Sequence, residues 1–327
     1  MCTSVLYAND GISYFGRNLD LQFAMGTSVT VTPRNYPFKF QETEGISSHA
    51  AMVGMSIVAD DGYPLYFEVM NEYGVGIAGL NFSGFAKYND EKVKGKINLG
   101  SFELMQYLLC TAKSVEDIKE MAQNINVRNI SHSAKYQASP LHWLCADATH
   151  TLVLEPTAQG LQIYENPTKV LTNQPDFISQ YYNFCNYMGL TSDYPTNRMA
   201  PKEDLEIFGT GMGSNGLPGG LSSVERFVRA GFTVANSKSD ATDEACLTQY
   251  FHIMQSVAQA NGCDQVEDKL YEITQYTCGT NLGTMDFYWT TYNNQQICGL
   301  HTKALDLDTD KVMTFPVSDK QGVAYIN

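Results

Sequence analysis

Residues 1–21 of the chain read MCTSVLYANDGISYFGRNLDL. Two runs of apolar, aromatic and β-branched residues, 4–8 and 12–15, flank Asn9-Asp10-Gly11, which predicts two strands joined by a turn. The second residue is Cys2, so removal of Met1 would leave one residue with both a thiol and a free α-amino group. These groups are a nucleophile and a base, a combination suited to acyl transfer. The alternative interpretation is a small apolar residue near one end of the chain.

The second predicted strand continues into a charged segment, Phe15-Gly16-Arg17-Asn18-Leu19-Asp20, one hairpin away from Cys2. An arginine beside a thiol favours the thiolate, and a carboxylate can hold an ammonium group in place. Alone, such a pair is more often a surface salt bridge. Together with an amino-terminal cysteine, Arg17 and Asp20 become candidate catalytic residues.

The pattern of the remaining residues predicts sheets covered by helices. Aromatic and β-branched runs bounded by Gly, Asn, Asp and Pro predict early strands at 4–8, 12–15, 28–33, 51–58, 65–70 and 74–80. Helical periodicity follows at 101–111 and 114–124, and later at 177–188, 222–236 and 243–260. Further strands are predicted at 142–146, 151–155, 161–164, 169–171, 270–277, 284–292, 296–301 and 311–316. This order indicates an α+β fold with mainly antiparallel sheets.

Length, composition and charge exclude several classes of protein. The 327 residues, 43% of them hydrophobic, can bury a large core, and no linker divides them, so we expect a single domain over 1–327. The net charge of −14 with scattered basic residues argues against nucleic-acid binding. The longest apolar stretches, 50–58 and 74–80, are too short to span a membrane, and no cleaved signal peptide is expected.

Three common motifs for catalysis, metal binding and phosphate binding are missing from the sequence. There is no Gly-x-Ser-x-Gly, His-Glu-x-x-His or Gly-x-x-x-x-Gly-Lys, and Gly211-Met212-Gly213-Ser214-Asn215-Gly216 precedes Leu217-Pro218 rather than a helix, which indicates a loop. The six histidines have no ligand spacing, and we expect His142 and His252 to be satisfied core residues. The eight cysteines form no close pairs, which favours reduced thiols in a cytoplasmic protein.

Several short segments occur in a characteristic order along the chain. They are Met1-Cys2-Thr3, Phe15-Gly16-Arg17-Asn18-Leu19-Asp20, Thr32-Pro33-Arg34, Met70-Asn71-Glu72, Gly79-Leu80-Asn81-Phe82, Leu141-His142-Trp143, Val170-Leu171-Thr172-Asn173-Gln174-Pro175, Gly216-Leu217-Pro218-Gly219 and Arg226-Phe227. In sequence, order and spacing these segments resemble the choloylglycine hydrolase family, which contains conjugated bile salt hydrolases and penicillin V acylases. The resemblance covers essentially the whole chain.

The resemblance implies a fold and a set of residue roles. The fold is the four-layer αββα sandwich of the amino-terminal nucleophile hydrolases. Cys2 matches the nucleophile, Arg17 and Asp20 hold and tune it, and Arg226 is a supporting charge. Asn81 and Asn173 match the oxyanion site, where fixed N–H donors stabilise the oxygen of a tetrahedral intermediate. From the residues alone, both asparagines are also ordinary turn residues.

Two positions bear on substrate and charge. The family's bile salt hydrolases resemble this chain in having Asn at position 81, whereas its penicillin V acylases tend to have Tyr there. The family often has Ala-Ser before the matching arginine, whereas this chain has Val224-Glu225, so a carboxylate at Glu225 could weaken the charge of Arg226. Arg226 is preferred over Arg229 because Arg226-Phe227 matches the motif.

The sequence therefore predicts a cytoplasmic amidase that hydrolyses glycine- or taurine-conjugated bile salts without a metal or organic cofactor, once Met1 has been removed. Leu19, Phe23 and Ala59 are candidate substrate-binding residues, and the resemblance implies a homotetramer. Penicillin V acylase, N-acyl homoserine lactone acylase and a noncatalytic steroid-binding protein stay open. Cys2 as a redox-sensitive surface thiol is a further interpretation, compatible with the enzyme.

Overall fold

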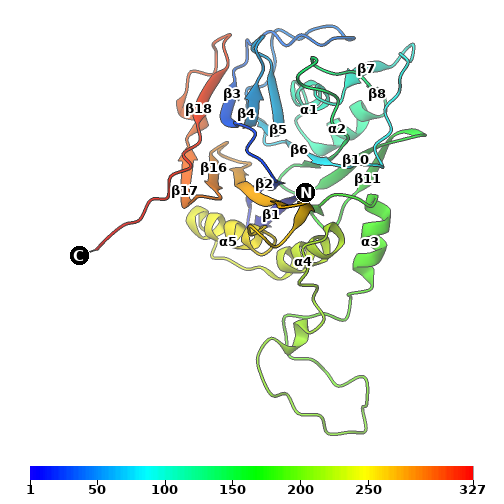
Figure 1. Ribbon diagram of the computed structural model, residues 1–327, viewed down its shortest axis with the longest axis vertical. Coiled ribbons are helices and arrows are strands. Elements are labelled where there is room, and N and C mark those ends of the chain that lie inside the picture. The colour runs from blue at the N-terminus through cyan, green and yellow to red at the C-terminus, as the bar shows by residue number, and fades with distance from the viewer. Residues whose placement is uncertain (327) are drawn as a thin grey trace.

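Two sheets lie face to face in the computed structural model, which describes residues 1–326. Helices cover the outer face of each sheet (Figure 1). Strand pairings within both sheets are antiparallel. The predicted α+β class and the four-layer αββα sandwich are confirmed.

The six-stranded sheet has the order β12-β1-β2-β15-β16-β17, so the first two strands of the chain lie near its centre. Both strands are buried along most of their length, as expected for strands that are covered on both faces. The strands are β1 (Cys2–Asn9), β2 (Ile12–Leu21), β12 (Val170–Leu171), β15 (Ile273–Asn281), β16 (Phe287–Thr291) and β17 (Asn294–Leu300).

The eight-stranded sheet has the order β11-β10-β9-β6-β5-β4-β3-β18. Its central strand β6 faces β1 and β2 of the other sheet. The strands are β3 (Ser28–Thr32), β4 (Met52–Val58), β5 (Pro64–Asn71), β6 (Gly76–Asn81), β9 (Leu141–Ala146), β10 (Thr151–Thr157), β11 (Gly160–Glu165) and β18 (Met313–Pro316).

The helices divide between the two outer faces. Helices α4 and α5 pack on the six-stranded sheet with α3 beside α4, and α1 and α2 pack on the eight-stranded sheet. Capping residues fix where the longer helices begin, because Ser114, Asp176, Ser222 and Thr242 each accept a main-chain N–H three residues ahead. The helices are α1 (Leu104–Leu109), α2 (Val115–Ala122), α3 (Phe177–Cys185), α4 (Ser223–Asn236) and α5 (Asp243–Gln255).

The apolar core has two parts that follow these layers. One part fills the space between the sheets and beneath α3, α4 and α5, and includes Val5, Phe15 and Phe227. The other lies between α1, α2 and the eight-stranded sheet, and includes Leu108 and Trp143. Cys2 belongs to the first part, so the candidate nucleophile lies in the interior next to the intersheet core.

Some predicted elements have different ends. The first helix begins only at Leu104, because the Glu103 carboxylate accepts the main-chain N–H groups of Gly100 and Gln41 and holds a turn there. The last helix ends at Gln255 rather than at residue 260. Beyond this end, the main-chain N–H of Gln259 donates to Thr274 Oγ1. The strands β7 (Ile97–Gly100), β8 (Ile125–Arg128) and β13 (Gln265–Glu267) and the separation of β14 (Leu270–Tyr271) from β15 were not predicted.

The segment between α3 and α4 extends away from the body of the molecule (Figure 1). It contains a short 3-10 turn, η1 (Met212–Ser214), so the glycine-rich motif lies in a loop as predicted. Gly211 has a φ of 79°, a left-handed conformation that favours glycine. No helix within residues 1–326 has the length and apolar composition needed to cross a membrane.

Candidate active site

Strand alternation decides which side chains surround Cys2. Paired residues of an antiparallel pair share one face of a sheet, and neighbours along a strand point to opposite faces. Cys2 pairs with Leu19, two residues from Arg17, so these three side chains share a face. Arg17 bonds to the eight-stranded sheet, whereas Thr3 bonds to α4 and Asn18 bonds to α5. The Cys2 side chain therefore points between the sheets.

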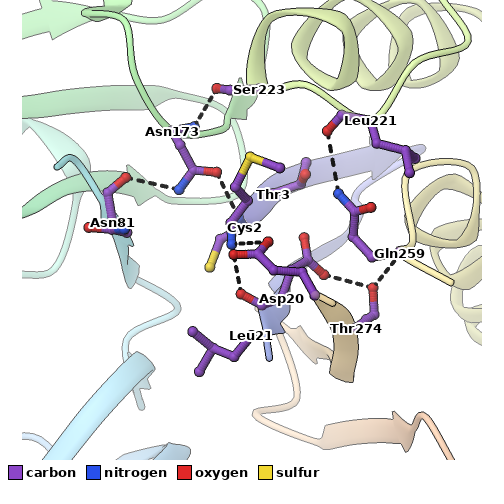
Figure 2. Close-up of polar contacts among 12 residues, drawn as sticks. Cys2, Thr3, Asp20, Leu21, Asn81, Asn173, Leu221, Ser223, Gln259 and Thr274 are labelled. Carbon is purple, nitrogen blue, oxygen red and sulfur yellow. Dashed lines mark hydrogen bonds and ion pairs between the residues drawn. The ribbon is translucent and has the colours of Figure 1, made fainter. Parts of the chain in front are cut away.

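The main chain of Cys2 is held by a buried asparagine. The N–H of Cys2 donates to Asn173 Oδ1 at 2.7 Å, and Asn173 Nδ2 donates to the carbonyl oxygen of Asn81 at 2.9 Å (Figure 2). This orientation of the amide satisfies its partners, since its oxygen faces donors and its nitrogen faces a carbonyl. One side chain thus joins the start of β1 to the end of β6.

Arg226 holds the same residue from the helix side. Its Nη1 donates to the carbonyl oxygen of Cys2 and to Thr3 Oγ1, both at 2.6 Å, and its Nη2 donates to Asn173 Oδ1 at 2.9 Å. The side chain is completely buried. Burial lowers the pKa of the Arg226 guanidinium, and the nearby carboxylate of Asp20 opposes that effect.

Glu225 forms no ion pair with Arg226 within residues 1–326, and the expected weakening of the Arg226 charge stays a prediction. Its Oε2 accepts a 2.8 Å hydrogen bond from Ser222 Oγ at the exposed first turn of α4. Burial lowers the pKa of the Arg229 guanidinium, as does the nearby charge of Arg226, and the charge of Glu225 opposes both effects.

Within residues 1–326, one carboxylate oxygen of Asp20 is hydrogen-bonded and the other is not. Its Oδ1 accepts a 2.7 Å hydrogen bond from Thr274 Oγ1, and its Oδ2 is buried without a partner in the described part of the chain. Burial raises the pKa of this carboxyl, whereas Arg226 and the amino terminus lower it. A buried acceptor without a donor costs about 1–3 kcal/mol, so Oδ2 can readily accept a bond from an ammonium group.

The amino group and the carbonyl group of Met1 also have bonding partners next to Cys2. Its amino group donates to the carbonyl oxygen of Asp20 at 2.8 Å and forms an ion pair with Glu272. The N–H of Asp20 in turn donates to the carbonyl oxygen of Met1 at 2.9 Å. With Met1 present, the Cys2 nitrogen is an amide and cannot serve as a base. Glu272 was missed in the sequence, where no motif surrounds it.

Arg17 lies between the two sheets, on the same face of the six-stranded sheet as Cys2. Its Nη1 donates to the carbonyl oxygens of Phe67, at 3.0 Å, and Gly79. Its Nε lies 3.8 Å from Glu68 Oε2, which accepts a 2.8 Å hydrogen bond from the Tyr276 hydroxyl. Burial raises the pKa of Glu68 to about 7, although Arg17 lowers it. Glu68 was also missed, because a single polar residue on a strand gives no signal.

The side chain of Asn81 lies at an exposed strand end. Asn81 ends β6 and is exposed, and its carboxamide has no hydrogen-bond partner within residues 1–326. The next residue, Phe82, stacks on the ring of His142 with 4.2 Å between ring centres. His142 also contacts Glu155 Oε1 and the carbonyl oxygen of Thr172, each at 3.0 Å. His142 therefore joins the segments that carry Asn81 and Asn173.

The two histidines expected in the core differ. His142 is completely buried with both ring nitrogens in contact with oxygen atoms, which confirms the prediction. His252 is exposed, so the prediction for it was wrong. It lies on the solvent side of α5, whereas its neighbours Phe251 and Ile253 are buried. Two apolar neighbours do not decide the direction of a helical residue between them.

An apolar cavity of about 240 Å³ lies close to this cluster. The carbonyl groups of Phe67 and Gly79, two of its lining residues, are those that bind Arg17. The main chain of these two residues therefore contacts Arg17, while the same residues line the cavity. Its apolar lining includes Met25, Ile57, Leu65, Phe67, Met105 and Leu141.

The three predicted substrate-binding residues lie in different environments. Leu19 is buried beside Cys2, and Ala59 is buried in the turn after β4, within the core beneath α1 and α2. Phe23 is 53% exposed. None of the three lines the apolar cavity, whereas Met25 and Ile57, each two residues away from one of them, do. Met25 follows Phe23 in the segment after β2, and Ile57 precedes Ala59 at the end of β4, so substrate binding by the three predicted residues stays a prediction.

The eight cysteines are free, and Cys2 is 3% exposed. The interpretation of Cys2 as a surface thiol is therefore wrong for this form of the chain. Within the described residues, no group of three or more His, Cys, Asp or Glu side chains is arranged to hold a metal ion.

Comparison with known proteins agrees with the residue pattern. The model of the linear amide C–N hydrolases, choloylglycine hydrolase family, matches residues 2–315. The chain belongs to the choloylglycine hydrolase family. It is therefore an amidohydrolase that acts on linear amides, as predicted from the sequence.

Members of the choloylglycine hydrolase family match this chain over 96–100% of its length. The bile salt hydrolase/transferase of Lactiplantibacillus plantarum is 41% identical over 100% of both chains. The conjugated bile acid hydrolase of Lactobacillus gasseri is 37% identical over 96% of this chain and 100% of the relative. The structure of the C2A conjugated bile acid hydrolase from Clostridium perfringens has a TM-score of 0.91 and 31% identity, with 100% of both chains covered.

A structure of penicillin V acylase from Agrobacterium tumefaciens is also similar, with a TM-score of 0.73 over 96% of this chain and 91% of that one. At 18% identity, this similarity shows the shared fold.

Proposed function

We propose that the chain hydrolyses the amide bond of glycine- or taurine-conjugated bile salts, with Cys2 as the amino-terminal nucleophile after loss of Met1. The observation that carries this proposal is the environment of the Cys2 nitrogen. It is 2.7 Å from Asn173 Oδ1, and the unpaired carboxylate oxygen of Asp20 is buried nearby. Such surroundings suit an α-amino group that gains and loses a proton. The relatives named bile salt or conjugated bile acid hydrolases support the substrate class.

The reaction begins at the Cys2 sulfur. The thiol proton passes to the α-amino group, and the thiolate attacks the amide carbonyl carbon. The side-chain amides of Asn81 and Asn173 donate to the oxygen as it gains negative charge. The carbon–nitrogen bond then breaks, and the leaving amine takes a proton from the α-ammonium group. Water hydrolyses the resulting thioester and regenerates the thiol.

The two arginines have separate roles in this proposal. Arg17 lies on the same face of the sheet as Cys2 and its positive charge stabilises the thiolate. Arg226 fixes the main chain of Cys2 through the carbonyl oxygen and through Asn173. Asp20 holds the α-ammonium group, and the apolar cavity lined by Met25, Phe67 and their neighbours binds the steroid.

Parallel assays with glycocholate, taurocholate, penicillin V and an N-acyl homoserine lactone test the substrate class. We expect turnover of one or both bile salts to exceed that of the other substrates. Faster turnover of penicillin V or of the lactone would identify the corresponding acylase instead. Tight bile-salt binding without release of glycine or taurine would indicate a noncatalytic steroid-binding protein.

The variant Cys2→Ala tests the nucleophile. We expect it to lose turnover and to retain the wild-type circular dichroism spectrum and unfolding transition. Cys2→Ser is the matched control, since it keeps a weaker nucleophile of similar size. A fully active alanine variant would contradict the mechanism.

We also propose that the protein is a cytoplasmic homotetramer. The extended segment between α3 and α4 supports association, because exposed apolar side chains gather on it and around it. These residues are Met188, Tyr194, Met199, Leu205, Ile207 and Phe208. Sedimentation velocity should give four chains per particle, and Phe208→Ser should shift the distribution toward smaller species. A monomer at micromolar concentration would contradict the proposal.

A further inference from the structure

Met1 places an ammonium group beside the nucleophile, and this group has a defined binding site. It donates to the carbonyl oxygen of Asp20 at 2.8 Å and pairs with Glu272. The Met1 side chain is 25% exposed and that of Glu272 is 10% exposed. The carboxylate is therefore mostly buried, but the position of Met1 can be reached from solvent.

Loss of Met1 removes the partners of three polar groups at once. Within residues 1–326, the Glu272 carboxylate accepts a hydrogen bond only from the Met1 amino group. The carbonyl oxygen of Asp20 loses the same amino group, and the N–H of Asp20 loses the Met1 carbonyl oxygen. A largely buried carboxylate without a donor is costly, so this arrangement favours binding of a new cationic or N–H donor.

The position of Met1 relative to Cys2 matches what the reaction requires. The nitrogen of the leaving amine must lie within hydrogen-bond reach of the Cys2 α-amino group in order to receive its proton. The carbonyl carbon of Met1 is bonded to that nitrogen here, and Asn173 Oδ1 lies 2.7 Å from it. The main chain of Met1 thus occupies space that adjoins the α-amino group of the mature enzyme.

We propose that Glu272 and the main-chain carbonyl of Asp20 form the subsite for the amino nitrogen of the amine that leaves or enters the acyl-enzyme. This inference rests on the proposed function. The subsite accepts an N–H bond from the substrate amide and an ammonium N–H from the free amine. Because the amine leaves and enters by the same path, Glu272 also controls how well an external amino compound competes with water for the thioester.

Groups at this position can accept both protons that the attacking amine releases in the transfer step. An ammonium acceptor first loses one proton to the Glu272 carboxylate, which frees its lone pair. The neutral nitrogen attacks the thioester carbon, and the carbon–sulfur bond breaks with its electron pair on the Cys2 sulfur. The second proton of the nitrogen passes to the Cys2 α-amino group. The products are a new amide, the protonated Glu272 carboxyl, and the Cys2 thiolate beside an α-ammonium group.

The local charges make Glu272 a suitable proton acceptor. Burial raises the pKa of this carboxyl, and the nearby Asp20 and Asp264 raise it further, while the amino terminus at Met1 lowers it. Loss of Met1 removes this opposing charge. A carboxyl with a raised pKa accepts a proton from an ammonium group more readily than an exposed glutamate does.

A chromogenic ester separates the proposed subsite from acylation of the enzyme. The 4-nitrophenyl ester of cholic acid acylates Cys2 without releasing an amine, and added glycine then competes with water for the thioester. Wild type, Glu272→Gln and the exposed-carboxylate control Glu267→Gln are compared after intact mass shows that each lacks Met1. Hydroxylamine, which is mostly uncharged at neutral pH, serves as the second acceptor.

We expect Glu272→Gln to lower the ratio of cholylglycine to free cholate about tenfold, as for loss of a hydrogen bond to a charged group. The ratio for hydroxylamine should change less than about twofold, and Glu267→Gln should behave as wild type. Equal loss for both acceptors, an unchanged glycine ratio, or loss confined to ester hydrolysis would overturn the inference. Absence of nitrophenolate release by the wild type would instead contradict the proposed function itself.

Discussion

The guanidinium of Arg226 donates a 2.6 Å hydrogen bond to the carbonyl oxygen of Cys2. This contact reaches the first residue of β1 from helix α4, on the side of the sheet opposite to the Cys2 thiol. Without Met1, the start of β1 loses its main-chain bond to Asp20, so Arg226 and Asn173 become the main constraints on the position of the nucleophile.

Replacement of Arg226 by Lys should therefore damage activity and stability together. A lysine can donate to the Cys2 carbonyl oxygen but not also to Asn173 and Leu221. We expect kcat to fall at least about tenfold and the free energy of unfolding to fall by about 2 kcal/mol. Urea unfolding and steady-state kinetics measure both, with Arg229→Lys in the same helix as the control. Equal behaviour of the two variants would contradict this role.

The two asparagines should differ in their effect on stability. The Asn81 carboxamide has no partner among the described residues, so Asn81→Ala should lower kcat about 10²–10³-fold and change the free energy of unfolding by less than about 0.5 kcal/mol. Asn173→Ala should lower both, because Asn173 also holds Cys2. Kinetics and urea unfolding of both variants test this. A stable, fully active Asn81→Ala variant would exclude an oxyanion role for that side chain.

Glu68 should make stability depend on pH. Burial raises its folded-state pKa from 4.5 to about 7, so the folded state binds a proton more tightly than the unfolded state. The stabilisation is present below about pH 4.5 and is lost as the pH rises through about 7, which amounts to about 3 kcal/mol. The difference in unfolding free energy between wild type and Glu68→Gln should follow this course. A pH-independent difference would show that Glu68 does not titrate in this range.

The apolar cavity predicts unequal effects at two positions in one loop. Met25 lines the cavity, whereas Phe23 is exposed. Met25→Ala should raise KM for a conjugated bile salt about tenfold or more, as for loss of a buried apolar side chain, and Phe23→Ala should raise it less than about twofold. KM measurements for both variants decide between the two positions. A larger effect at Phe23 would restore the residue chosen from the sequence.

The sequence predicted well those features that depend on local pattern or on motif. Alternation and turn residues located most strands, and capping residues such as Ser114 and Ser222 located helix starts. The motif segments carried Cys2, Arg17, Asp20, Asn81, Asn173 and Arg226, which the structure brings to the start of β1 and the strands and helix around it.

Features that depend on distant packing could not be predicted in this way. Glu272 meets Met1 across almost the whole length of the chain, and Glu68 meets Arg17 only because two sheets pack together. The direction of Phe23 and Ala59 likewise depends on loops whose conformation is set by tertiary contacts. The residues next to these positions in the sequence form no pattern that predicts such contacts.

Intact-mass analysis of the rapidly quenched reaction with a conjugated bile salt tests the central claim most directly. We predict that the active enzyme has the mass of the chain without Met1, and that a transient bile-acyl increment appears on Cys2 and decays as bile acid is released. Fragmentation should place this increment on the amino-terminal residue. Full activity with Met1 retained, or an acyl group on another residue, would contradict the account.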